Sequence, residues 1–177
     1  MPQSSSLRLT KATYTSAQRS EFLDKVPWSK EFSWKQIELI ADRMQTYEVN
    51  KGVEIFNDNT PERYMCLIIK GSVNIVKKDS SRGRRVITTF ERGHAFGEMS
   101  LVDEEPRSAA AVAAEDTLLL ILTQESFAQI LHTYHALGVK LLMKITRMLS
   151  QRLRSTSGML TDALESKGEQ EFFRMTS

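Results

Sequence analysis

The sequence holds a single cysteine, Cys66, among its 177 residues. One cysteine cannot form an internal disulfide, and it excludes metal sites that are built from several cysteines. Hydrophobic runs are also short, because no stretch approaches the roughly 20 apolar residues that a membrane-spanning helix needs. The N-terminal residues lack the apolar segment of a secretory signal. These absences exclude a membrane-spanning protein, a disulfide scaffold and a cysteine-rich zinc domain, and they predict a cytoplasmic protein with no membrane partner.

An excess of charge of one sign is missing as well. The chain has 24 basic and 22 acidic residues, which gives a formal net charge of +2. This small excess gives no reason to expect a nucleic-acid partner. The composition is 41% apolar and 26% charged, which is typical of a globular protein. A chain of this length predicts one domain with short extensions and a substantial hydrophobic core.

Short runs rich in β-branched and aromatic residues occupy the region between residues 49 and 123. Turn residues such as Gly71 and Gly93 separate these runs. Several short strands at this spacing predict a β-barrel or β-sandwich. The expected strands cover residues 53–56, 64–70, 73–76, 85–90, 109–112 and 117–122.

The region before the strands predicts an arm and a helix. Residues 1–20 are rich in Ser and Thr, and we expect them to form a flexible arm because they offer little to bury. Residues 33–46 predict a helix, and Ser33 and Gln36 form a candidate capping box at its start.

The region after the strands predicts two helices. Thr123 is a candidate N-cap for the first of them. We expect Gly138 to separate this short helix from a longer one that ends near residue 165. Residues 166–177 are then a C-terminal tail.

The longer helix carries apolar and polar residues at alternating spacings of three and four, the pattern of two helices packed side by side. This seam consists of Leu142, Ile145, Leu149, Arg152, Thr156, Met159 and Ala163. The seam can pack against the protein's own barrel or form a homodimer. We favour a homodimer through residues 139–163, because the helix looks too long for a small barrel to cover. Another face carries Lys140, Lys144, Arg147 and Arg154, which we expect to be solvated.

Residues 96–110, FGEMSLVDEEPRSAA, combine features that suit an anion. Gly97 permits a close backbone approach, and the short helical turn expected after it offers free N–H groups. Arg107 and the hydroxyl of Ser108 can hold a phosphate, and Glu98 can accept a hydrogen bond from a sugar hydroxyl. Taken alone the pattern is weak, because an arginine near acidic residues usually forms a salt bridge.

The same stretch resembles the phosphate-binding cassette of cyclic nucleotide-binding domains. Residues 51–76, KGVEIFNDNTPERYMCLIIKGSVNIV, resemble the opening strands of that family. The resemblance implies an α+β, mainly β fold: an eight-stranded, jelly-roll-like β-roll with flanking N-terminal helices and a long C-terminal dimerisation helix. The domain would span residues 21–165, with the β-roll at about 49–123 and the C-terminal helices at about 124–165.

The resemblance also implies which residues contact a cyclic nucleotide. Arg107 would pair with the charged phosphate, and Glu98 would accept a hydrogen bond from the ribose 2′-hydroxyl. The implied contacts are Arg107, Ser108 and Ala109 for the phosphate, Gly97, Glu98 and Met99 for the ribose, and Ile75, Ile87 and Thr88 for the base.

Residues 151–157, QRLRSTS, resemble the central helix of the bacterial cAMP-receptor branch of this family. In that branch an arginine faces the ligand and a Thr-Ser pair reads the adenine, with the serine coming from the partner subunit. Arg152, Thr156 and Ser157 stand at those positions, and the seam already contains the first two. The resemblance therefore implies a homodimer that binds cAMP in preference to cGMP.

These observations predict a stand-alone, non-enzymatic cAMP sensor that couples ligand binding to a change in the long helix and to an unidentified effector protein. The Phe172-Phe173 pair is one candidate docking point. About 20 residues follow Ser157, too few for a helix-turn-helix domain. His132 and His135 lack the further ligands of a metal site, so no metal is expected. Two alternatives stay open: an interaction scaffold whose site is idle or takes a cyclic dinucleotide, and a DNA-binding regulator that uses the basic helix face.

Overall fold

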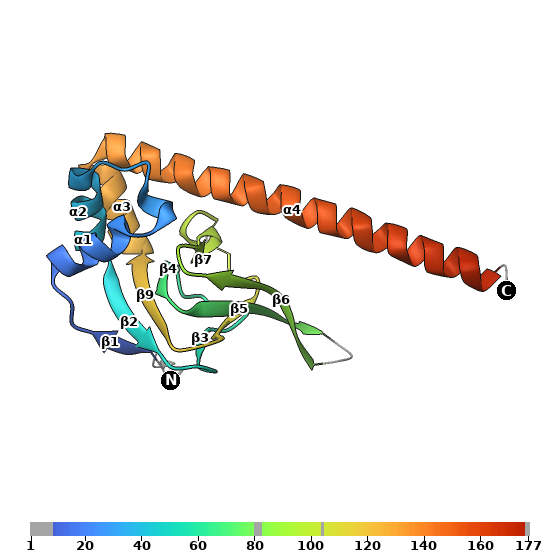
Figure 1. The fold of residues 1–177 in the computed structure, drawn as a ribbon. Coiled ribbons are helices and arrows are strands. Elements are labelled where there is room, and N and C mark those ends of the chain that lie inside the picture. Colours follow the sequence, from blue (N-terminus) through green and yellow to red (C-terminus); the bar gives the residue numbers. More distant parts are fainter. Residues whose placement is uncertain (1–8, 80–82, 104, 176–177) are drawn as a thin grey trace. The chain divides into compact units, whose positions relative to one another are not determined.

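The computed structural model describes residues 9–79, 83–103 and 105–175, and it describes side chains as far as residue 165 except at residues 78 and 79. Nine strands lie in these ranges: β1 (Thr10–Ala12), β2 (Gln45–Val49), β3 (Glu54–Phe56), β4 (Tyr64–Lys70), β5 (Ser72–Asp79), β6 (Gly83–Glu91), β7 (Ala95–Phe96), β8 (Ala110–Ala113) and β9 (Thr117–Thr123). They form two antiparallel sheets, ordered β1-β2-β9-β4-β7 and β3-β8-β5-β6 (Figure 1). The predicted mainly β fold with flanking helices is confirmed, as two sheets and not a closed barrel.

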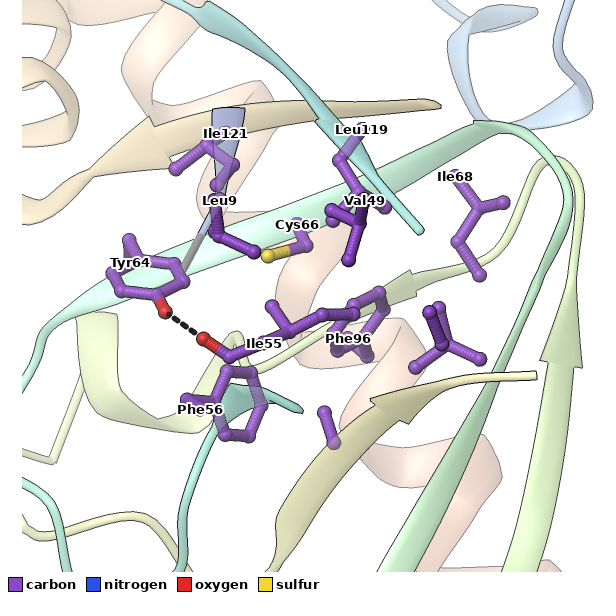
Figure 2. Close-up of a cluster of buried hydrophobic side chains, with 13 residues drawn as sticks. Leu9, Val49, Ile55, Phe56, Tyr64, Cys66, Ile68, Phe96, Leu119 and Ile121 are labelled. Carbon is purple, nitrogen blue, oxygen red and sulfur yellow. Dashed lines mark hydrogen bonds between the residues drawn. The ribbon is translucent and has the colours of Figure 1, made fainter. Parts of the chain in front are cut away.

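Strand β4 shows why the two sheets pack together. Every residue of this strand except Lys70 is buried, so its apolar run has both faces covered. Tyr64, Cys66 and Ile68 alternate along the strand and point into a cluster that both sheets contribute to (Figure 2). The hydroxyl of Tyr64 donates to the carbonyl of Ile55 at 3.0 Å. Cys66 is fully buried, and this burial raises the pKa of its thiol to about 12.

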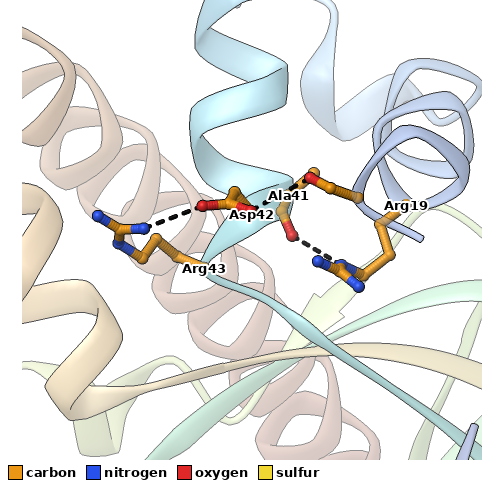
Figure 3. A network of polar contacts seen from close by, with 5 residues as sticks. Arg19, Ala41, Asp42 and Arg43 are labelled. Carbon is orange, nitrogen blue, oxygen red and sulfur yellow. Dashed lines mark hydrogen bonds and ion pairs between the residues drawn. The ribbon is translucent and has the colours of Figure 1, made fainter. Parts of the chain in front are cut away.

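Two short helices lie between β1 and β2 in the chain, α1 (Ser16–Asp24) and α2 (Trp34–Asp42). The predicted capping box of Ser33 and Gln36 at the start of α2 is confirmed. Arg19 ties the two helices together, because its Nε donates to the carbonyl of Ala41 at 2.9 Å (Figure 3). Asp42 pairs with Arg43 at 3.0 Å beside this bond.

The N-terminal part of the chain differs from the expected arm. Residues 10–12 form β1, which pairs antiparallel with β2, and α1 begins at Ser16. Leu9 is only 8% exposed and belongs to the core cluster. This segment therefore buries an apolar side chain, which was not expected from the sequence. Residues 1–8 of the expected arm lie outside the described residues.

The helix predicted for residues 33–46 ends earlier, at Asp42. The following residues form β2, in which Thr46 and Val49 are buried and the strand pairs with β9. The six expected strands are all present, with ends that differ by up to three residues. The strands β1, β2 and β7 were not predicted, because each is too short or too polar to stand out from its surroundings.

The C-terminal helices are α3 (Gln124–Thr133) and α4 (His135–Met175). Thr123 caps α3 as predicted, since its hydroxyl accepts from the N–H of Ser126 at 3.2 Å. The expected break at Gly138 was wrong. The break falls at Tyr134, whose backbone leaves the helical region, and α4 accommodates Gly138 at a cost of about 1 kcal/mol relative to alanine.

The chain divides into two compact units, residues 1–137 and 138–177. In the second unit Leu153, Met159, Leu160 and Leu164 are 58–69% exposed. Helix α4 continues past the expected end at residue 165, and the Phe172-Phe173 pair lies outside the residues whose side chains are described. Among the described helices, none combines the length and the hydropathy needed to cross a membrane.

Candidate ligand-binding site around Arg107

Arg107 lies at the end of the loop between η2 (Met99–Leu101) and β8. The loop between β3 and β4 holds its backbone from the other side. The N–H of Arg107 donates to the carbonyl of Thr60 at 3.1 Å, and its carbonyl accepts from the N–H of Asn59 at 2.9 Å. Asn59 adopts a left-handed backbone with φ of 59°, a conformation that asparagine tolerates better than most residues. These two bonds fix where the arginine side chain starts.

The guanidinium of Arg107 is almost completely enclosed, because the residue is 4% exposed. Its Nη1 donates to the carbonyl of Gly97 at 2.8 Å and to Oγ of Ser100 at 2.7 Å, and its Nη2 donates to the carbonyl of Tyr64 at 2.7 Å. The rings of Phe56 and Tyr64 lie 4.1 Å and 4.5 Å from the guanidinium carbon. Nε is buried, and no described residue accepts a hydrogen bond from it.

Arg107 is a buried cation, and the carboxyl group of Glu62 is an acidic neighbour that acts on it electrostatically. Burial lowers the pKa of Arg107. Burial also raises the pKa of the Tyr64 phenol, and the positive charge of Arg107 partly offsets that rise. The ion pairs found among the described residues do not include Arg107. Burying a charge outside an ion pair is costly, so an anion that reached this guanidinium would remove part of that cost.

Gly97 has a conformation and surroundings that require glycine. Strand β7 pairs with β4, with Phe96 opposite Cys66, and so brings Gly97 next to Tyr64. The φ of Gly97 is +75°, and a Cβ at this position would lie 2.7 Å from Nη1 of Arg107 and 3.1 Å from the carbonyl oxygen of Tyr64. Glycine therefore lets the backbone carbonyl approach the guanidinium closely enough to accept its hydrogen bond.

The other cassette residues differ in exposure. Glu98 is 1% exposed and immediately precedes η2, the short helical turn that the sequence predicted. Met99 is 46% exposed. Ser108 is exposed and Ala109 is half-buried, so the chain passes from the buried guanidinium to the surface within one residue. The structure thus brings Gly97 and Arg107 into contact. Glu98 follows Gly97 in the sequence and is also buried.

The three residues expected to line a base lie on the β5–β6 hairpin. Ile75 is half-buried against the core cluster and pairs with Thr88 across the two strands. The register shifts between Ile75 and Val76, and the next pair is Val76 with Val86. Ile87 is therefore the extra residue of a β-bulge, and it is 56% exposed. Of the three, Ile75 and Thr88 are held together by strand pairing, whereas Ile87 is not.

The three helix residues expected to contact the base belong to the second unit of the chain. Thr156 and Ser157 are exposed and Arg152 is half-buried. Arg152 and Thr156 are four residues apart, so they share one face of α4. In this unit, taken by itself, the Thr-Ser pair is accessible to a ligand or to another chain.

Sequence reasoning missed Ser100, Tyr64 and Phe56. The sequence did contain a signal for Ser100, because this residue carries a hydroxyl and follows Gly97 by three positions. Tyr64 contributes a backbone carbonyl and Phe56 a ring face, and neither role can be read from residue type. Among the described residues, no group of three or more His, Cys, Asp or Glu side chains is arranged to hold a metal ion.

Comparisons with known proteins identify the family of this domain. Residues 47–134 match the family model described as cyclic nucleotide-binding domain. The chain is 30% identical over 120 residues to a cyclic AMP receptor protein of Thermus thermophilus, with 68% of this chain and 54% of the relative covered. It is 28% identical over 110 residues to a cAMP-dependent protein kinase regulatory subunit of Aspergillus fumigatus, with 62% of this chain and 26% of the relative covered.

A solved structure resembles the whole fold. A crystal structure of a cyclic nucleotide-binding domain from Methylobacillus flagellatus gives a TM-score of 0.73 at 27% identity, and the match covers 83% of this chain and 84% of that one. The two curated relatives are longer, and this chain spans about half of one and a quarter of the other. The comparison therefore extends to the domain and not to the whole length of those relatives.

Proposed function

Residues 47–134 belong to the cyclic nucleotide-binding domain family, and from that premise we propose that this chain is a regulatory domain that binds cAMP. The observation that carries the proposal is the buried cation of Arg107. The residue is 4% exposed, and its guanidinium forms no ion pair with a carboxylate among the described residues. Its Nε is buried and has no hydrogen-bond partner among them. A cyclic phosphate carries one negative charge, which could pair with the guanidinium, and oxygen atoms, which could accept from the unpaired Nε.

We assign the remaining contacts by position in the cassette. Ser108 and Ala109 follow Arg107 at the surface and would add a hydroxyl and backbone N–H groups to the phosphate. Gly97, Glu98 and Met99 would contact the ribose. Glu98 is 1% exposed, and its carboxyl group would accept a hydrogen bond from the 2′-hydroxyl, a contact that a deoxyribose ligand cannot make.

We further propose that cAMP is preferred to cGMP and that the domain works as a homodimer. The support for the base preference is the Thr156-Ser157 pair, together with Arg152, Ile75, Ile87 and Thr88. The support for the homodimer is the seam along residues 139–163, on which the exposed Met159 lies. The names of the Thermus and Aspergillus relatives, a cyclic AMP receptor and a subunit of a cAMP-dependent kinase, favour cAMP as the ligand.

The proposed role is regulatory and non-catalytic. A ligand shifts a conformational equilibrium only through its different affinities for the two states. Contacts from α4 to the bound base would supply such a difference, because they exist only when helix and ligand meet. The output would pass through α4 to an effector protein, which the sequence does not identify.

Titration calorimetry of the purified chain with cAMP, cGMP and cyclic di-GMP, combined with light scattering, tests this function. We expect cAMP to bind most tightly, with one molecule per chain of a dimer. Tightest binding of cyclic di-GMP would favour the alternative of a repurposed site. If none of the three binds, the chain is better described as an interaction scaffold, and the proposal is wrong.

A further inference from the structure

Ser100 is a buried hydroxyl in direct contact with the guanidinium of Arg107. The residue is 3% exposed. Its Oγ accepts from Nη1 of Arg107 at 2.7 Å and donates to the carbonyl of Gly97 at 3.0 Å. The same carbonyl also accepts from Nη1 at 2.8 Å. The hydroxyl, the carbonyl and Nη1 therefore form a closed triangle of hydrogen bonds.

The hydrogen-bond donors of Arg107 divide into two groups. A guanidinium has five N–H donors, and Nη1 uses both of its own on Gly97 and Ser100. Nη2 makes one bond, to the carbonyl of Tyr64, and Nε makes none with the residues described. The unused donors are thus on Nε and Nη2, which share one edge of the guanidinium. Such an edge can hold two phosphate oxygens at once.

The surroundings of the guanidinium restrain its tilt and its rotation by different means. The rings of Phe56 and Tyr64 lie within 4.5 Å of its central carbon and limit how far it can tilt. Ring faces resist rotation of the guanidinium within its own plane much less than directional hydrogen bonds do. The bonds of Nη1 to Ser100 and Gly97 supply that directional restraint at one end of the group, and the bond of Nη2 to Tyr64 adds to it.

We propose that Ser100 is a positioning residue that holds the Nη1 end of Arg107 and thereby leaves the Nε–Nη2 edge for the phosphate of the ligand. This inference rests on the proposed function. An unpaired buried donor costs free energy, and a phosphate oxygen on Nε would remove that cost. Binding has to uncover the edge, which is buried only one residue away from the exposed Ser108. Without the hydroxyl, Arg107 samples orientations in which this edge is turned away.

The first test compares two buried serines by calorimetry with cAMP. Ser100→Ala is expected to weaken binding by about tenfold, the cost of one charge-assisted hydrogen bond. Ser29→Ala is the matched control, because Ser29 is also fully buried and its hydroxyl bonds the backbone carbonyls of Leu23 and Val26. We expect this control to lower the unfolding temperature and leave cAMP affinity unchanged. Thermal unfolding of the ligand-free variants checks that both remain folded.

The second test reads the guanidinium directly. In a proton–nitrogen NMR spectrum, the Nε–H resonance of Arg107 is assigned by its loss in Arg107→Lys. Addition of cAMP should move this proton downfield in the unmodified chain, and the shift should be smaller in Ser100→Ala. In an Arg107→Lys background, Ser100→Ala should cause no further loss of affinity, because lysine has no edge to orient.

The outcomes separate this inference from the function on which it rests. If the unmodified chain binds no cyclic nucleotide, both are wrong. If it binds cAMP but Ser100→Ala binds equally tightly or more tightly, Ser100 does not position the arginine and the proposed function stands. The same conclusion follows if the Nε–H resonance of Arg107 does not respond to cAMP.

Discussion

The segment around Arg107 and the second half of helix α4 differ in how far their side chains are buried and bonded within a single chain. Glu98, Ser100 and Arg107 are each at most 4% exposed, and the guanidinium makes three hydrogen bonds to its own chain. In α4, by contrast, Leu153 and Met159 are 69% and 58% exposed. In one region the polar side chains are buried and bonded by their own chain, whereas the other region exposes apolar side chains.

This difference separates two properties of the proposed sensor. In the proposed function, phosphate binding would depend on backbone carbonyls, a glycine and an arginine that the first unit holds in place by itself. Base selection and output would depend on α4, whose exposed residues a second helix or a partner would cover. Substitutions in the first region should therefore change affinity, and substitutions in the second should change self-association or selectivity.

The largest effect is expected for Arg107→Ala. This change removes the cation and both donors proposed to bind the phosphate, and charge-assisted hydrogen bonds contribute about 1.5–3 kcal/mol each. Affinity for cAMP should fall by at least about 100-fold in calorimetry. Arg84→Ala is the control, because Arg84 is a surface residue paired with Glu54 at 2.6 Å. An unchanged affinity in Arg107→Ala would remove the arginine from the site.

Gly97→Ala should have the next largest effect, mainly on stability. A residue with a side chain at positive φ costs about 1–2 kcal/mol, and the added Cβ would also lie 2.7 Å from Nη1 of Arg107. Gly52→Ala isolates the first contribution, because Gly52 has φ of +81° and a Cβ added there would meet no atom within 4 Å. Urea denaturation should show the greater loss for Gly97→Ala. Equal losses in the free energy of unfolding would mean that the close contact with Arg107 does not contribute to the destabilisation.

Much of the first unit could be predicted from local pattern. The strand over residues 64–70 was predicted with its correct ends, because a continuous apolar run between turn residues has few other interpretations. The cap at Thr123 followed from side-chain chemistry alone. The cassette placed Gly97 and Arg107 in one site, although they are ten residues apart.

What could not be predicted depends on contacts between distant segments. Strand β2 contains Gln45, Thr46 and Glu48, and it becomes a strand because β9 and β1 pair with its two edges. Gly138 was expected to end a helix, and only the surrounding helical turns show that α4 continues through it. The Tyr64 carbonyl reaches Arg107 across 43 positions of sequence, and no residue type announces a backbone acceptor.

A smaller effect is expected for the exposed surface of α4. Met159 lies on the seam and Leu160 does not, yet both are similarly exposed, at 58% and 60%. Met159→Glu should raise the dissociation constant of the homodimer by about tenfold or more, because it places charge in an apolar contact. Leu160→Glu should leave the dimer unchanged. Sedimentation velocity distinguishes the two, and equal behaviour of both variants would show that the seam is not the dimer contact.

The smallest effect, and the one that most sharpens the comparison, is expected for the double change Thr156→Ala with Ser157→Ala. Neutral hydrogen bonds contribute about 0.5–1.5 kcal/mol, so the preference for cAMP over cGMP should fall by roughly fivefold. Thr146→Ala is the control, since Thr146 is an exposed threonine earlier on α4. Phosphate and ribose are common to both nucleotides, so a true base contact lowers affinity for cAMP and spares cGMP. An equal loss for both nucleotides would instead mean that the pair acts through the dimer, and the base would then be read by the β5–β6 hairpin alone.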